Sequence, residues 1–145
     1  EIFIMLALIA PAHAETSISQ LIADYNVLSK TTDAFKLSKD IMYESGDSVS
    51  FTKGTTTVAF TKDKNGDFKT GAVYANSFED LISCAAVTGI YISQNPDEYI
   101  EFLGWLDYMY YWVNRGKDPF YKKYGDYTFN IEKKGIGYLF MIMKV

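Results

Sequence analysis

Four large aromatic side chains stand close together in the segment that follows Pro96. Helical spacing places Trp105, Tyr108 and Trp112 on one side of a predicted helix, and Tyr111 lies beside them. Trp and Tyr bury a large area at a small entropic cost and keep a polar tip for hydrogen bonding. Side chains of this kind are frequent anchors of protein–protein interfaces. These four residues are therefore the candidate partner-binding residues of the chain.

The same aromatic stripe has a second interpretation, in which it belongs to the core. Aromatic residues at helical spacing are usually buried, and an amphipathic helix predicted over residues 17–30 could pack across them. The broad opposite face of the aromatic helix is predicted to be core in either case; it comprises Tyr99, Phe102, Leu103, Leu106, Met109, Tyr110 and Val113.

Catalytic side chains are few. The single histidine, His13, lies in a segment that we expect to be removed, and the single cysteine, Cys84, lies in an apolar helical segment. Triads that use an imidazole base and most zinc sites are therefore excluded. We assign no catalytic residue, metal or cofactor. An enzyme that uses carboxylates and Tyr is the alternative, although we expect Asp107, in the aromatic helix, to be partly exposed rather than a desolvated acid.

Residues 63–67, Asp-Lys-Asn-Gly-Asp, resemble the opening of an EF-hand calcium loop, because oxygen ligands alternate along them. The rest of that motif is missing, since Phe68 stands where the sharp turn needs Gly and Tyr74 stands where a bidentate Glu is needed. We therefore predict a hairpin turn, with Asn65 and Gly66 both at positive φ in a type I′ conformation.

A second aromatic group follows the aromatic helix and consists of Phe120, Tyr121, Tyr124 and Tyr127 around Lys122 and Lys123. Gly116, Pro119 and Gly125 predict that residues 117–125 form a loop. The aromatic rings of this loop could line a ligand groove or close one end of the core, and the sequence leaves both interpretations open.

The N-terminal residues predict export. An apolar run from Ile2 to Ala10 precedes Ala12-His13-Ala14, a small-x-small sequence typical of a signal-peptidase site. The run is too short for a permanent membrane span, which needs roughly 20 residues. We expect residues 1–14 to be a signal peptide that is clipped at its N-terminus. Residues 15–145 would then form a single globular domain that is secreted or periplasmic.

The order of the predicted elements gives the fold class. A helix is followed by three strands, two helices and two strands, which predicts an α+β domain in the order α-βββ-αα-ββ. We expect an antiparallel sheet of about five strands with the helices packed on one face. The last strand, 138–145, is apolar on both faces, which predicts an interior position in the sheet.

The composition narrows the class of partner. The chain has a net charge of −4 and a single arginine, Arg115, so nucleic-acid binding is not expected. We predict a small exported binding or inhibitory module whose aromatic-rich surface contacts another extracytoplasmic protein or a glycan. The alternatives are an extracytoplasmic enzyme that depends on carboxylates and Tyr, and an assembly subunit that uses strand 138–145.

Overall fold

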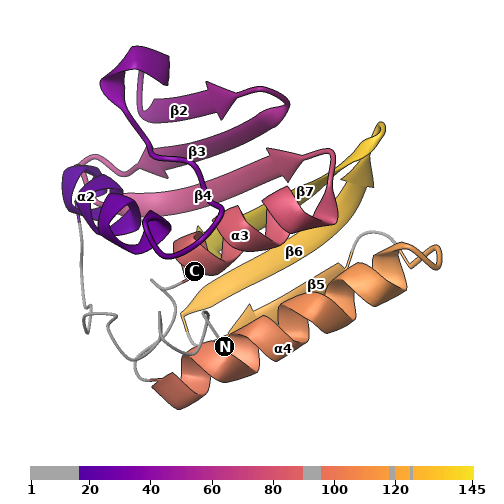
Figure 1. The fold of residues 1–145 in the computed structure, drawn as a ribbon. Coiled ribbons are helices and arrows are strands. Elements are labelled where there is room, and N and C mark those ends of the chain that lie inside the picture. Colours follow the sequence, from indigo (N-terminus) through magenta and orange to yellow (C-terminus); the bar gives the residue numbers. More distant parts are fainter. Residues whose placement is uncertain (1–16, 90–95, 118–119, 125) are drawn as a thin grey trace.

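The computed structural model describes residues 17–89, 96–117, 120–124 and 126–145 (Figure 1). The predicted signal peptide, residues 1–14, lies outside the described residues. The elements, in chain order, are α2 (Ile18–Ser29), the 3₁₀ turn η1 (Lys39–Ile41), β1 (Met42–Ser45), β2 (Ser48–Lys53), β3 (Thr56–Lys62), β4 (Phe68–Ala75), α3 (Phe78–Thr88), α4 (Pro96–Val113), β5 (Phe120–Tyr124), β6 (Tyr127–Lys134) and β7 (Gly137–Lys144).

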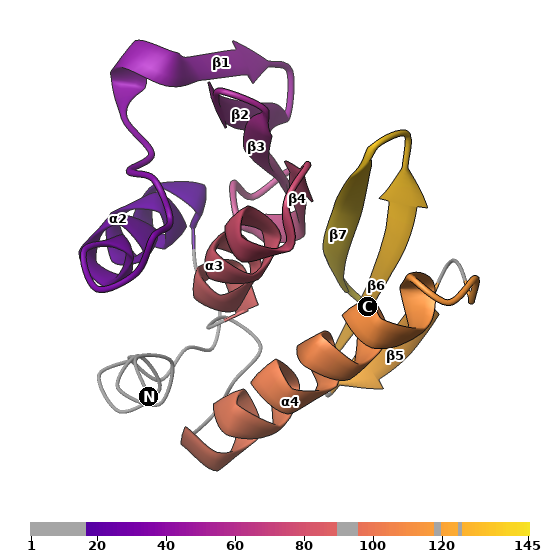
Figure 2. The ribbon, with the colours of Figure 1, turned by 45° about the vertical axis from the view of Figure 1, so that its right-hand side comes forward.

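The strands form one antiparallel sheet in the order β1-β2-β3-β4-β7-β6-β5. The described helices lie on one face of this sheet, which curves around them (Figures 1 and 2). The α+β class predicted from the sequence is confirmed. The predicted count of about five strands is wrong, because the described residues form seven.

The two strands missing from the prediction, β1 and β5, are the two edges of the sheet. Strand β1 is short, and its last three residues are exposed, so its sequence does not show the alternation of a half-buried strand. The prediction of a loop over residues 117–125 is wrong, because Phe120–Tyr124 pairs with β6 over five residues. The Gly and Pro residues that suggested a loop flank this strand instead of interrupting it.

The core lies between the sheet and the helices. Alternate residues of the interior strands are fully buried, among them Val58, Phe60, Val73, Phe129, Ile131, Phe140 and Ile142. Leu21 and Tyr25 of α2, Leu81 of α3 and Phe102 of α4 cover them from the helical side. Each large apolar side chain buried in this way stabilises the fold by about 1.5–3 kcal/mol relative to its exposed state.

Strand β7 occupies the interior position that its apolar sequence predicts, between β4 and β6. Only one of its faces is buried, however. Phe140 and Ile142 point into the core, whereas Leu139 and Met141 on the outer face are half-buried and Met143 is exposed. An assembly that used β7 would therefore have to contact the outer face of the sheet, because both edges of the strand are already paired.

The hairpin between β3 and β4 is confirmed, but its turn is not of type I′. Gly66 has a φ of 84°, and none of the described residues other than glycines has a positive φ. The Asp63 carboxylate explains the difference, because its Oδ1 accepts hydrogen bonds from the backbone N–H groups of Asn65, at 2.8 Å, and Asp67, at 3.1 Å. The Gly66 N–H closes the turn on the Asp63 carbonyl, at 3.0 Å.

Helix α2 is held to this hairpin at its N-terminus. Ser17 caps the helix by accepting a hydrogen bond from the Gln20 N–H at 3.2 Å, and the Ile18 N–H donates to the Gly66 carbonyl at 3.3 Å. The buried side of α2 then packs against α3 and β3. No helix within the described ranges has the combined length and hydropathy of a membrane span.

Candidate functional site

Helix α4 lies across β6 and β5, where its apolar face closes one end of the core (Figure 1). Tyr99, Phe102, Leu106, Met109 and Val113 are buried, as their spacing predicts, and Leu103 and Tyr110 are half-buried. The Tyr99 hydroxyl donates a buried hydrogen bond to the carbonyl of Ala86 in α3. This bond joins the buried face of α4 to α3.

The structure separates the four predicted anchors into two groups. Tyr108 and Tyr111 are 52% and 47% exposed, and Trp112 beside them is half-buried. The centroid of the Trp112 ring lies 6.1 Å from that of Tyr108 and 5.4 Å from that of Tyr111. We call Tyr108, Tyr111 and Trp112 the α4 aromatic face.

Trp105 differs from the other three anchors. Its ring packs edge-on against the buried Phe129 of β6, with 4.4 Å between centroids and planes at 89°. Trp105 therefore adds to the core contacts of α4, and its half-buried state reflects its position at the margin of the helix. Helical spacing alone could not separate it from Trp112, because the two residues are seven positions apart and share one side of the helix.

Arg115 orders one ring of the α4 aromatic face. Its guanidinium carbon lies 3.5 Å from the centroid of the Tyr111 ring, and its Nη1 donates to the Tyr111 carbonyl at 3.2 Å. A cation over an aromatic ring at this distance contributes about 0.5–1 kcal/mol at an exposed site. The only arginine of the chain thus holds Tyr111 in place and adds a positive charge to the rim of this face.

Helix α2 does not cover the α4 aromatic face. It packs on α3 and β3, and α3 lies between α2 and α4 over the sheet (Figures 1 and 2). The cover that the core interpretation required is therefore not supplied by α2.

The second predicted aromatic group, Phe120, Tyr121, Tyr124 and Tyr127, does not form one surface, because side chains alternate between the two faces of a strand. Tyr121 of β5 is 68% exposed, whereas Tyr127 of β6 is half-buried and packs against Phe68, with 6.2 Å between ring centroids. The side chains of Phe120 and Tyr124 lie outside the description. Because neighbouring residues of a strand point to opposite faces, Tyr121 and Lys122 cannot contribute to the same surface.

The described titratable groups do not form a catalytic constellation around α4. Asp107 is exposed, as we expected for a structural aspartate. Burial raises the pKa of Tyr138, as does the neighbouring Tyr110 hydroxyl, and the Tyr138 hydroxyl donates to the Asn114 side chain at 2.5 Å. Across the described ranges, no three His, Cys, Asp or Glu side chains gather closely enough to hold a metal ion.

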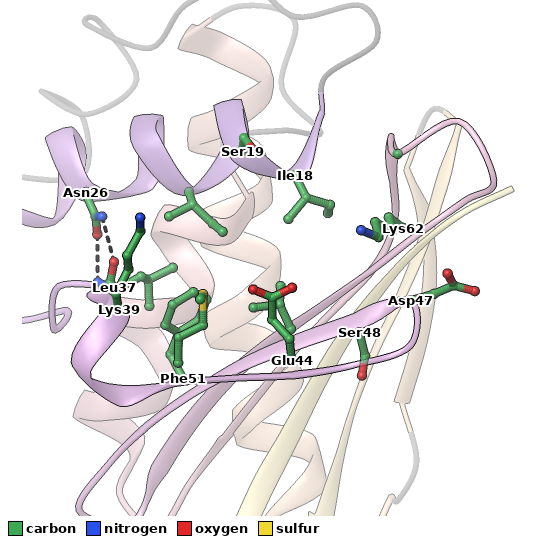
Figure 3. Close-up of a pocket in the computed structure, with 14 residues that line it drawn as sticks. Ile18, Ser19, Asn26, Leu37, Lys39, Glu44, Asp47, Ser48, Phe51 and Lys62 are labelled. Atoms are coloured by element: carbon green, nitrogen blue, oxygen red, sulfur yellow. Dashed lines mark hydrogen bonds between the residues drawn. The ribbon is translucent and has the colours of Figure 1, made fainter.

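A groove that the sequence did not predict separates α2 from strands β1 and β2 (Figure 3). Its volume is about 610 Å³, and we call it the α2–β1 groove. Strand β1 contributes Met42 and Glu44 to the groove. Because one of these side chains is apolar and the other is charged, β1 has no uniform inner face from which the sequence could have predicted the groove. The Glu44 carboxylate points into the groove and that of Asp47 points away, so the pair of carboxylates that the enzyme alternative requires is not formed there.

Comparison of the chain with protein-family models, with curated proteins and with solved structures found no match in any of the three.

Proposed function

We propose that this protein is a small exported binding or inhibitory module that docks another extracytoplasmic protein through the α4 aromatic face. The observation that carries the proposal is the exposure of two neighbouring tyrosines, Tyr108 and Tyr111, on a helix whose opposite side packs into the core. About half of each tyrosine is exposed, and burial of aromatic area is a main source of interface energy.

The geometry of the rings favours a protein partner over a glycan. The plane of Trp112 is inclined by 64° to that of Tyr108 and by 83° to that of Tyr111. Rings inclined in this way do not form the flat platform on which a sugar ring stacks, but they can enclose a protruding side chain of a partner. Arg115, ordered on Tyr111, adds a donor of the type that is enriched at protein interfaces.

Export is part of the same proposal and is supported by the apolar run and the Ala12-His13-Ala14 sequence. We propose that the protein is secreted or periplasmic and meets its partner in that compartment.

A pull-down from the native extracytoplasmic fraction, followed by titration of the purified partner, tests this function. We expect Tyr108→Ala and Tyr111→Ala each to weaken binding by about 30-fold, which corresponds to ~2 kcal/mol per anchor. Tyr43→Ala is the matched control, because Tyr43 is 69% exposed on β1 at the opposite edge of the sheet. Equal binding by all three variants would refute the proposal.

Stability measurements separate docking from folding. Tyr108→Ala should change the free energy of unfolding by no more than about 0.5 kcal/mol, because its side chain is exposed. Tyr111→Ala should lower it by no more than about 1 kcal/mol, since it also loses the contact with Arg115. Trp105→Ala should lower it by about 1–3 kcal/mol, because Trp105 packs on Phe129. A loss of binding that is accompanied by a large loss of stability in the tyrosine variants would point to a structural role.

A further inference from the structure

The α2–β1 groove has the size and lining of a small-molecule site. Its volume of about 610 Å³ lies within the range of roughly 300–1,000 Å³ that such sites occupy. Apolar side chains from α2, the segment before η1, β1 and β2 form its walls; they are Ile18, Ile22, Leu37, Met42, Val49 and Phe51. Ile22 and Met42 are half-buried and so present apolar surface that a ligand could cover.

Hydrogen bonds fix both ends of the groove. At one end, the Asn26 side chain donates to the Leu37 carbonyl at 2.9 Å and accepts from the Leu37 N–H at 2.7 Å (Figure 3). At the other end, the Lys62 N–H donates to the Asp47 carbonyl at 2.9 Å, and α2 is bonded to Gly66. Because the protein makes these contacts within its own chain, little further ordering would oppose binding.

The lining of the groove is polar as well as apolar, and three charged side chains point into it. Figure 3 shows the Glu44 carboxylate directed toward α2, with the Lys39 and Lys62 side chains on either side of it. In the described part of the chain, no ion pair or side-chain hydrogen bond is formed by any of the three. Their charges are therefore available to a ligand that carries one group of each sign.

We infer that the α2–β1 groove binds a short apolar peptide or apolar amino acid with free termini. The ligand ammonium group would pair with Glu44, its carboxylate would pair with one of the flanking lysines, Lys39 or Lys62, and its apolar side chains would lie on the half-buried Ile22 and Met42. Charge-assisted hydrogen bonds of this kind give orientation as well as affinity.

The position of Glu44 favours a zwitterion over an apolar acid as the ligand of the groove. An apolar acid such as decanoate would also satisfy the lysines, but its chain would cover Glu44 and leave that carboxylate desolvated without a cation. A zwitterion supplies this cation itself. This inference is independent of the α4 aromatic face, because the groove lies at the other edge of the sheet.

Titration of the protein with leucyl-leucine, followed through backbone amide chemical shifts, tests this inference. We expect shifts around Ile22, Met42 and Phe51 and saturation at about 10 mM, which is roughly tenfold above a Kd of 1 mM. N-acetyl-leucyl-leucine lacks the ammonium group and leucyl-leucinamide lacks the carboxylate. Each should bind about tenfold more weakly than leucyl-leucine.

Substitutions in the groove test which protein residues pair with the ammonium group and the carboxylate of the ligand. Glu44→Gln should weaken leucyl-leucine about tenfold and leave the acetylated peptide bound as well as before or more tightly, because that peptide supplies no cation to Glu44. Lys39→Gln/Lys62→Gln should weaken leucyl-leucine and leave the amide unchanged. Glu101→Gln and Lys122→Gln/Lys123→Gln are the matched controls, because these exposed residues lie on α4 and β5. All of these substitutions are at exposed positions, and a thermal melt confirms that each variant is folded.

Three outcomes would overturn the inference. The first is the absence of shifts with leucyl-leucine at about 10 mM, and the second is equal binding of the blocked and free peptides. The third is binding of decanoate at the same amides when leucyl-leucine does not bind, which would identify the groove as a site for apolar acids.

Discussion

Among the described residues, the buried Tyr25 hydroxyl has only a weak acceptor beside it. Tyr25 of α2 is fully buried, and its hydroxyl lies next to the Cys84 thiol without a hydrogen bond of normal geometry. Burial raises the pKa of Tyr25 well above its ordinary value, so the hydroxyl stays neutral. A buried polar group without a proper partner costs about 1–3 kcal/mol.

We therefore expect Tyr25→Phe to leave the free energy of unfolding unchanged or to raise it by up to ~1 kcal/mol. Urea denaturation of the variant and the wild type measures the difference. Tyr99→Phe is the matched control and should be destabilising, because the Tyr99 hydroxyl donates to the Ala86 carbonyl. A loss of more than about 1 kcal/mol in Tyr25→Phe would show that the Cys84 contact is a strong bond.

For single residues, the sequence predicted which side chains share a helix better than it predicted which residues they contact. It placed Tyr108, Tyr111 and Trp112 on one helix, and the structure exposes the first two. It could not predict that Trp105 meets Phe129, because that contact depends on where β6 lies beneath α4. The charged residues of the α2–β1 groove were not predicted for the same reason, since Glu44 and Lys62 come together only through strand pairing.

Among the elements, the β3–β4 hairpin depends on one carboxylate. Backbone hydrogen bonds from Asp67 and Asn65 lower the pKa of Asp63 below its ordinary value of 3.8. Since the folded-state pKa is the lower one, the ionised carboxylate stabilises the folded state. This contribution is complete above the unfolded-state pKa and disappears as the pH falls through the folded-state pKa.

We expect Asp63→Ala to lower the urea midpoint at neutral pH, because two backbone N–H groups lose their acceptor. Asp63→Asn keeps an acceptor and should lower the midpoint less. The difference between wild type and Asp63→Asn should shrink as the pH falls from about 5 to about 2. A difference that does not change with pH would show that the negative charge has no role in the turn.

The helices and interior strands were predictable because each buries one face and shows the corresponding period. Helix α2 buries Leu21, Tyr25 and Leu28 at helical spacing, and β3 alternates between buried and half-buried residues. The edge strands β1 and β5 were not predictable from this signal, because Tyr43–Ser45 of β1 and Tyr121–Lys123 of β5 are exposed without alternation. The failure at β5 also explains why a loop of aromatic residues was expected there.

For the whole molecule, the packing of α2 on α3 can be measured through Cys84. The thiol is 2% exposed beneath α2, and burial raises its pKa, so the reactive thiolate is scarce in the folded state. Because the chain has a single cysteine, a reagent that labels thiols reports on this site only.

We expect a thiol reagent to label Cys84 in the native protein at least about 1,000-fold more slowly than in the urea-unfolded chain. The labelling rate should rise with urea along the slope of global unfolding, since α2 and α3 share one core. Rapid labelling without a dependence on urea would instead show that α2 separates from α3 while the sheet remains intact.

The strand order has a consequence for how the molecule could be used. Strands β1 and β2 form one end of the sheet, and β6 and β5, beneath α4, form the other. A ligand in the α2–β1 groove would not contact α4, so we expect the thermodynamic coupling between binding at the two ends to be close to zero. If both proposals hold, we expect the affinity for the protein partner to be the same with and without leucyl-leucine.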